Sequence, residues 1–138
     1  EPMTDGPLIN LANVQYTVSD ETLASVDVNS SVVLNATPEA HSAWISFAVS
    51  TIQPSNYVYF DLDFTSPQAG QGIFTTFMNN TDLGYMDERF YQSGSARQVA
   101  GYPLTAAGTF IVTFRLDQSG ALPTSVLVKN VGTGLFTE

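Results

Sequence analysis

The stretch from Ala43 to Phe64, AWISFAVSTIQPSNYVYFDLDF, decides the fold. Apolar residues alternate with other residues in two segments, 43–50 and 57–64, and the polar residues 53–56 separate the segments. A β-strand has a side-chain period of two residues, so each segment predicts a strand with one apolar face and one mixed face. The residues between them predict a turn. If the two strands pair as a hairpin, their mixed faces lie on the same side.

The rest of the chain repeats this pattern. Short segments of strand-like composition recur about every ten residues, and clusters of Gly, Pro, Asn, Asp and Ser separate them. Candidate strands are residues 8–12, 14–18, 23–28, 31–36, 43–50, 57–65, 72–79, 83–86, 88–91, 98–100, 109–117 and 125–131. Helical periodicity is not sustained over three turns anywhere. The pattern predicts an all-β fold, an antiparallel β-sandwich of the jelly-roll type with about ten short strands, and a single module over residues 1–138.

Matching apolar faces predict which residues form the core. The alternation in three candidate strands turns one set of side chains toward a common interior. This set is Ile45, Phe47, Val49, Val58, Phe60, Leu62, Phe64, Phe110, Val112, Phe114 and Leu116.

The composition excludes several classes of function. The chain has 4 Lys and Arg against 13 Asp and Glu, and its formal net charge is −9. Such a surface repels phosphate backbones and anionic lipids, so we expect neither nucleic-acid binding nor membrane binding, and a neutral polysaccharide is favoured over a polyanionic one. The chain has no Cys, which excludes disulfides and thiolate metal sites, and no apolar run approaches the length of a membrane span.

Low charge and abundant Ser, Thr and Asn are common in secreted β-proteins. The sequence begins at EPMTDGP without a signal peptide, which predicts a mature or excised module of a longer, multidomain chain. We therefore expect a secreted or cell-surface protein of bacterial type.

The order of the strand segments carries a resemblance. YVYFDLDF, a Gly-rich loop, GIFTTFMNN, GTFIVTFRLD and SVLVKNV follow one another between residues 43 and 131. This order resembles the jelly-roll domains of exported bacterial proteins, which include carbohydrate-binding modules. In such domains the last strand often ends in Asp-Asn-Val, but here Lys129 takes the place of that Asp. The resemblance implies a carbohydrate-binding function, and the Lys puts an Asp calcium ligand at that position in doubt.

The mixed faces of residues 43–50 and 57–64 carry the candidate ligand site. Trp44, Tyr57 and Tyr59 offer flat rings on which the apolar face of a sugar stacks, and Asp61 and Asp63 offer acceptors for its hydroxyls. Arg115, outward on the segment 109–117, is a further hydroxyl-binding candidate or an ion-pair partner of the two acids. The alternative is that loops or a second sheet cover these rings and that the acids are simply solvated.

Catalysis and metal binding have weaker signals. Asp61 and Asp63 are one pleat apart, a spacing that a glycosidase or a small lyase would also allow. His41 is the only His, and no nucleophile motif accompanies it. Asp82, Asp87 and Glu88 form an oxygen-rich group, so calcium is a possible structural ligand.

These observations predict a non-catalytic carbohydrate-binding module with polysaccharide as its partner. A structural or adhesive module of an exported protein, without a glycan site, is the alternative. An exposed platform of the three aromatic rings would separate the two.

Overall fold

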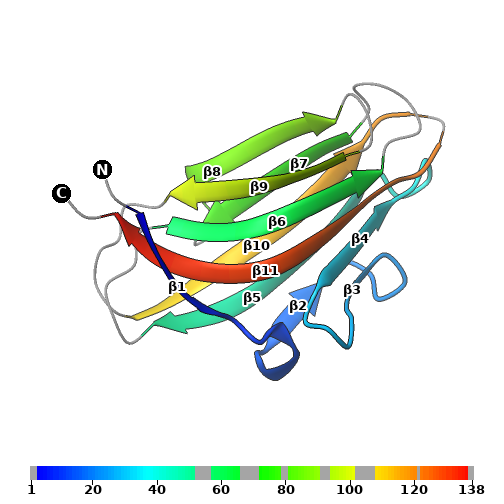
Figure 1. The fold of residues 1–138 in the computed structure, drawn as a ribbon. Coiled ribbons are helices and arrows are strands. Elements are labelled where there is room, and N and C mark those ends of the chain that lie inside the picture. The colour runs from blue at the N-terminus through cyan, green and yellow to red at the C-terminus, as the bar shows by residue number, and fades with distance from the viewer. Residues whose placement is uncertain are drawn as a thin grey trace.

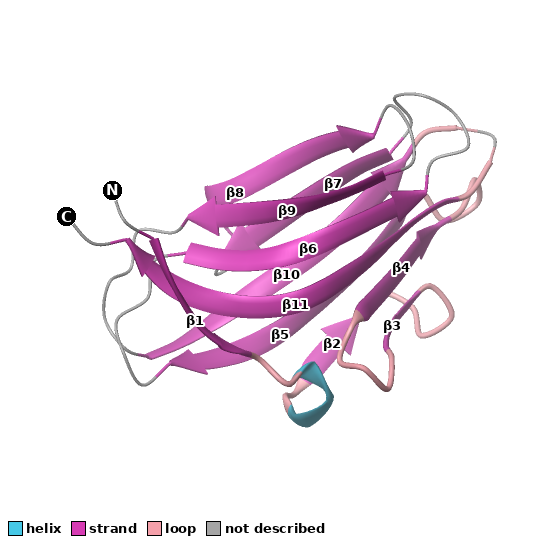
Figure 2. Cartoon of the chain, in the orientation of Figure 1, coloured by secondary structure: helices cyan, strands magenta, loops and turns pink. Residues whose placement is uncertain are grey.

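Two antiparallel sheets pack face to face in the computed structural model, which describes residues 3–51, 57–65, 72–78, 81–90, 94–101, 108–120 and 122–136 (Figures 1 and 2). The front sheet of Figure 1 has the order β3-β4-β11-β6-β9, with β1 also paired to β11, and the back sheet has the order β2-β5-β10-β7-β8. The predicted all-β sandwich is confirmed.

The front sheet contains β1 (Met3–Leu8), β3 (Ala24–Val26), β4 (Val32–Ala36), β6 (Tyr57–Thr65), β9 (Gly94–Gly101) and β11 (Thr124–Phe136). The back sheet contains β2 (Tyr16–Val18), β5 (Ser42–Thr51), β7 (Gly72–Met78), β8 (Thr81–Phe90) and β10 (Gly108–Gln118). One 3-10 turn, η1 (Leu11–Asn13), follows β1, and the Asn10 side chain accepts a hydrogen bond from the N–H of Ala12 at its start. No helix in the described part of the chain is long and apolar enough to cross a lipid bilayer.

Several predicted strand boundaries are wrong, among them those of β9, which begins at Gly94 and not at residue 98, and of β11, which continues to Phe136. Residues 8–12 are not a strand, because β1 ends at Leu8 and η1 follows. The segments 83–86 and 88–91 belong to a single strand, β8, which pairs with β7. The prediction of 57–65 is confirmed, and that of 43–50 is confirmed to within one residue.

Ten of the eleven predicted core residues lie in or against the core between the sheets, which also contains further residues such as Leu34, Phe74 and Val128. Ile45, Phe60, Leu62, Phe114 and Leu116 are fully buried. Phe47, Val49, Val58 and Val112 are buried as well, and Phe64 packs against the core while partly buried. The side chain of Phe110 lies outside the described residues.

An aromatic cluster joins the two sheets at the centre of this core. The ring of Phe60, from the front sheet, lies 5.0 Å from that of Phe114 and 5.7 Å from that of Phe74, both in the back sheet. Phe47 adds a contact of 5.4 Å to Phe114. Tilted and edge-to-face contacts of this kind add stability beyond the apolar area that they bury.

The strands β5 and β6 do not form a hairpin. β5 pairs with β2 and β10 in the back sheet, whereas β6 pairs with β9 and β11 in the front sheet. The chain therefore crosses from one sheet to the other between Thr51 and Tyr57. Two strands that each have one apolar face bury those faces equally well as neighbours in one sheet or opposite each other across a core. Here the two strands lie in opposite sheets.

Strand β1 brings the two ends of the described chain together. It runs antiparallel to the last part of β11, and Met3 is the partner of Phe136. Both ends therefore lie at the same end of the sandwich (Figure 1).

Candidate functional site

The six predicted site residues lie on two opposite faces. Trp44 and Arg115 are on the outer face of the back sheet, and Tyr57, Tyr59, Asp61 and Asp63 are on the outer face of the front sheet. The expectation that Trp44 shares one exposed platform with the two tyrosines is wrong. The reason is the crossing between β5 and β6, which turns their mixed faces away from each other.

The two tyrosines are buried although they point away from the core. Tyr57 is 0% exposed and Tyr59 is 6% exposed. The hydroxyl of Tyr57 donates to Asp5 Oδ1 at 2.7 Å, and the hydroxyl of Tyr59 donates to the carbonyl of Gly6 at 2.5 Å. Both acceptors belong to β1, so the rings pass across β11 and end against that strand. They are not available to stack on a sugar.

Two glycines of β11 make room for these rings. Gly132 is the cross-strand partner of Tyr59, and Gly134 is the partner of Tyr57. A Cβ atom at Gly132 would lie 2.7 Å from Cε1 of Tyr59 and closer still to its Cζ atom and hydroxyl. A Cβ atom at Gly134 would overlap the ring of Tyr57 in the same way. The four residues form what we call the tyrosine clasp: two rings lying over two glycines and bonded to β1.

The two acids of β6 are bonded to β11. Asp63 forms an ion pair of 2.6 Å with Nζ of Lys129, and Asp61 accepts a hydrogen bond of 2.9 Å from Nδ2 of Asn130. The hydrogen bond to Asp63 and its charge raise the pKa of Lys129 above its usual 10.5, and the charge of Asp61 adds to this. Asn130 has a left-handed φ of 54° where the register of β11 shifts, and this irregularity brings its side chain to Asp61.

On the back sheet, Trp44 and Arg115 are direct neighbours. They are cross-strand partners on β5 and β10, and such pairs place their Cβ atoms about 4.5–5.5 Å apart. The backbone N–H of Trp44 also donates a hydrogen bond to Oγ of Ser19 at 3.0 Å, which connects β5 to the residue that follows β2. Arg115 is exposed and Trp44 is half-buried.

A network of three side chains fixes the guanidinium. Nε of Arg115 donates to Oδ1 of Asp117 at 3.0 Å, and Nη2 donates to Oγ of Ser42 at 3.3 Å. The hydroxyl of Ser42 donates in turn to the same Asp117 oxygen. Arg115 and Asp117 form an ion pair with side chains 45% and 33% exposed. The network is therefore pre-organised and still open to solvent.

The next row across this face is made of hydroxyls. Thr17, Ser46 and Thr113 lie side by side on β2, β5 and β10. The hydroxyls of Ser46 and Thr113 are 2.6 Å apart and share a hydrogen bond. Neither Thr17 nor Ser46 is among the predicted site residues, although strict alternation in 43–50 places Ser46 outward.

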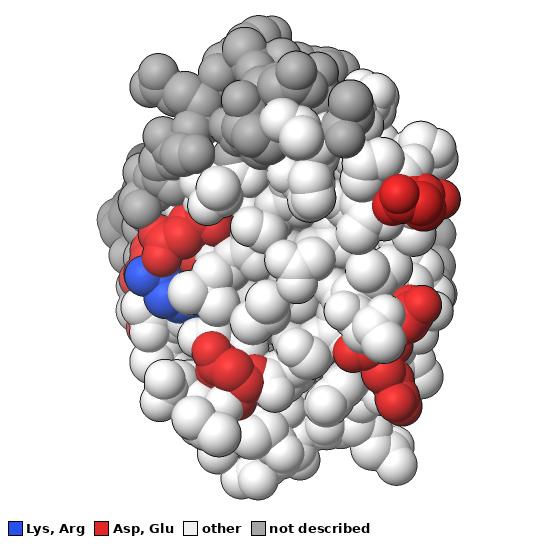
Figure 3. Space-filling model, turned by 90° about the vertical axis from the view of Figure 1, so that its right-hand side faces the viewer, with Lys and Arg blue, Asp and Glu red and all other residues white. Residues whose placement is uncertain are grey.

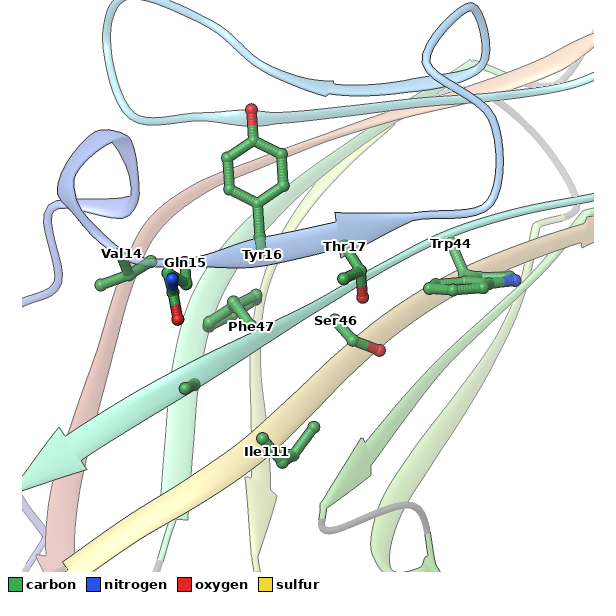
Figure 4. A pocket seen from close by; sticks show the side chains of 9 residues that line it. Val14, Gln15, Tyr16, Thr17, Trp44, Ser46, Phe47 and Ile111 are labelled. Atoms are coloured by element: carbon green, nitrogen blue, oxygen red, sulfur yellow. The ribbon is translucent and has the colours of Figure 1, made fainter.

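Thr17 and Ser46 line an open groove of about 860 Å³. Its lining combines Trp44 with Thr17 and Ser46, and with the apolar side chains of Ala48 and Ile111. Figure 4 shows Trp44 at one end of this group, and it shows Tyr16 pointing from β2 in the direction opposite to Thr17. At this groove, β2 pairs with only residues 45–47 of β5.

The described residues contain no group of three or more His, Cys, Asp or Glu that could hold a metal ion. The acids on which the calcium expectation rests, Asp82, Asp87 and Glu88, have side chains outside the described part of the structure. His41 is exposed at the end of the loop before β5, and its carbonyl accepts from the N–H of Gln118 at 2.9 Å.

Charged groups are sparse among the described residues on the side of the molecule that Figure 3 shows. Figure 3 shows acidic side chains separated by a broad uncharged area on one end of the sandwich, with few Lys and Arg atoms. The few basic side chains on this side agree with the net charge of −9.

No family model matches the sequence, and no curated protein matches it either. Solved structures do share its fold. A family 61 carbohydrate-binding module in complex with β-1,4-galactotriose is similar over 94% of this chain and 91% of its own, with a TM-score of 0.56 and 10% identity. A family 36 module in complex with calcium and xylotriose is similar over 99% of this chain and all of its own, with a TM-score of 0.52 and 13% identity.

A larger protein contains a similar domain. A secreted serine protease of Vibrio cholerae has a TM-score of 0.63 and 14% identity over 89% of this chain, which spans 25% of the protease chain. The resemblance to jelly-roll carbohydrate-binding modules and to domains of secreted bacterial proteins is thus confirmed at the level of the fold.

Proposed function

We propose that this chain is a non-catalytic carbohydrate-binding module that holds a neutral polysaccharide on the outer face of its back sheet. The observation that carries the proposal is the pair Trp44 and Arg115 beside an open groove of about 860 Å³. A half-buried indole provides a stacking surface for a pyranose ring, and the fixed guanidinium provides donors for its hydroxyls.

The difference between the two faces supports this location. On the front sheet, Tyr57, Tyr59, Asp61 and Asp63 all have partners in β1 or β11. On the back sheet, the described residues accept hydrogen bonds from Arg115 only at Asp117 and Ser42, so none of the described residues occupies its other N–H groups.

The size of the face sets the expected affinity. Successive residues of a strand are about 3.3 Å apart, so the distance along β5 from Trp44 to Ala48 is about 13 Å. This length accommodates two to three sugar rings, of which one stacks on Trp44. We therefore expect modest binding in which much of the sugar remains hydrated.

The proposal places the module in an exported, multidomain protein, as in its structural neighbour from the secreted protease. Calcium has a structural role in this proposal and takes no part in binding chemistry. Calcium is included in the proposal because the family 36 neighbour is in complex with calcium and xylotriose.

Affinity electrophoresis on neutral glucans, xylans, mannans and galactans tests the function. At least one of these should retard the wild type, and Trp44→Ala should weaken that binding by about 1–2 kcal/mol, roughly tenfold, because it removes the stacking surface. Asp63→Asn changes the opposite face and serves as the matched control, with no expected effect.

Two results would contradict the proposal. If Asp63→Asn weakens binding and Trp44→Ala does not, the ligand lies on the front sheet. If no polysaccharide retards the folded wild type, the chain is a structural or adhesive module.

A further inference from the structure

The hydrogen-bonding capacity of the Arg115 network defines which sugars it accepts. Arg115 has five N–H groups, and the described residues take two of them, one at Asp117 and one at Ser42. Asp117 accepts both of its hydrogen bonds at Oδ1, so Oδ2 has no hydrogen-bond donor among the described residues. As far as the described residues go, donors of Arg115 and an acceptor of Asp117 therefore remain for a ligand, next to Trp44.

We infer that Asp117 is the residue that determines specificity on this face, and that it restricts the site to sugars with hydroxyls and excludes sugars with carboxylates. This inference rests on the proposed function. A hydroxyl accepts from Arg115 and donates to Asp117, so a pair of neighbouring hydroxyls satisfies both side chains. A carboxylate only accepts, and it would place its charge next to that of Asp117.

The charge of the guanidinium does not reverse this preference. Asp117 lies 3.0 Å from Nε of Arg115 and neutralises it, and the chain as a whole carries a net charge of −9. A ligand carboxylate therefore meets a neutral ion pair in an acidic surrounding. The ion pair of Arg115 and Asp117 therefore binds hydroxyls. An unpaired Arg at the same position would bind carboxylates through its planar, bidentate guanidinium.

The test uses matched ligands that differ only in charge. β-1,4-Galactan, β-1,4-mannan and β-1,4-glucan are each compared with the same polysaccharide after oxidation of its C6 hydroxymethyl groups to carboxylates. Isothermal titration calorimetry gives the ratio of the affinity for the neutral form to the affinity for the oxidised form. The wild type should prefer the neutral form of whichever polysaccharide it binds.

Three variants isolate the effect of Asp117. Asp117→Asn should lower this ratio by about fivefold, because two like charges about 4–5 Å apart in water repel each other by an energy equivalent to that factor. Asp117→Glu retains the charge and should retain the preference. Asp27→Asn is the charge-matched control in the turn between β3 and β4, where the amide oxygen still accepts from Asn29 and Ser31, and it should leave the ratio unchanged.

The outcomes separate this inference from the proposed function. Equal changes of the ratio in Asp117→Asn and Asp27→Asn would mean that overall charge decides, and the inference would be overturned while glycan binding stands. The same holds if the wild type binds both forms equally. If the wild type binds neither these three polysaccharides nor xylan, the proposed function itself fails.

Discussion

The mutation Tyr59→Ala separates a structural role of this ring from a ligand-binding role. On a sugar-binding platform, its loss would weaken binding and leave the fold intact. In the structure, however, Tyr59 is 6% exposed and its hydroxyl is bonded to Gly6 in β1. We therefore expect Tyr59→Ala to reduce the stability of the fold.

The magnitude follows from what the side chain buries. Removal of a buried aromatic side chain costs about 3–5 kcal/mol, and the hydrogen bond of the hydroxyl accounts for about 1 kcal/mol of this. Tyr59→Phe should therefore cost about 1 kcal/mol. For a domain of this size, 1 kcal/mol corresponds to roughly 3–5 °C in melting temperature. Urea unfolding, followed by tryptophan fluorescence and by circular dichroism, measures the loss of unfolding free energy in Tyr59→Ala and in Tyr59→Phe.

Gly132 supplies an internal check. Gly132→Ala alone should destabilise the protein by about 1–3 kcal/mol, because the new methyl group meets the ring of Tyr59. In the Tyr59→Ala background the same change should cost much less, since the ring is gone. A loss below about 1 kcal/mol for Tyr59→Ala, or strictly additive effects in this double-mutant cycle, would refute the tyrosine clasp.

Three further predictions concern the core, the pH and calcium. Phe60→Ala should cost about 3–5 kcal/mol in urea unfolding, because the ring lies at the centre of the aromatic cluster, and a loss below about 1 kcal/mol would mean that the register of β6 is shifted by one residue. Hydrogen bonds from the hydroxyl and the N–H of Thr22 lower the pKa of Asp20 below its usual 3.8, so its stabilising effect is present above that pH and is lost as the pH falls through the folded-state pKa. Asp20→Ala should therefore destabilise the protein at neutral pH, and its difference from the wild type should shrink in unfolding curves recorded well below pH 3.8; a difference independent of pH would contradict this. Saturating calcium should raise the melting temperature relative to chelator if the ion is a structural ligand, and identical temperatures would remove calcium from the proposal.

The sequence predicts the strands and the core because alternation is a local property. In β5, β6 and β10, large apolar residues occupy every second position, and such a pattern has only one face to bury. The predicted segment 125–131 ends before the far end of β11, where Gly132 and Gly134 are residues that weaken a strand locally. Glycine is needed at these two positions because of long-range contacts, since the rings that cover them come from a strand some seventy residues earlier.

The composition of the site could be predicted only in part, because it depends on sheet assignment. Alternation places Trp44, Tyr57 and Tyr59 outside the core, but it does not say which sheet each strand joins. Once β5 and β6 are in opposite sheets, Trp44 meets Arg115, and the tyrosines meet β1. The covering of an outward ring by a terminal strand has no local signal at all.

The pairing of β1 with the end of β11 has a mechanical consequence. Met3 and Phe136 are cross-strand partners, so any polypeptide joined to the two ends of this chain pulls at the same end of an antiparallel pair. Force then acts on the hydrogen bonds between β1 and β11 one after another, as in opening a zipper. The hydrogen bonds of the tyrosine clasp to β1 resist the same separation. A ligand on the opposite sheet would be held by β5 and β10, which lie outside this line of force. An optical trap that pulls on residues 3 and 136 should therefore record a first extension step of about one strand at low force, and Tyr59→Phe should lower that force; a single rupture of the whole domain, unchanged in the variant, would contradict this order of events.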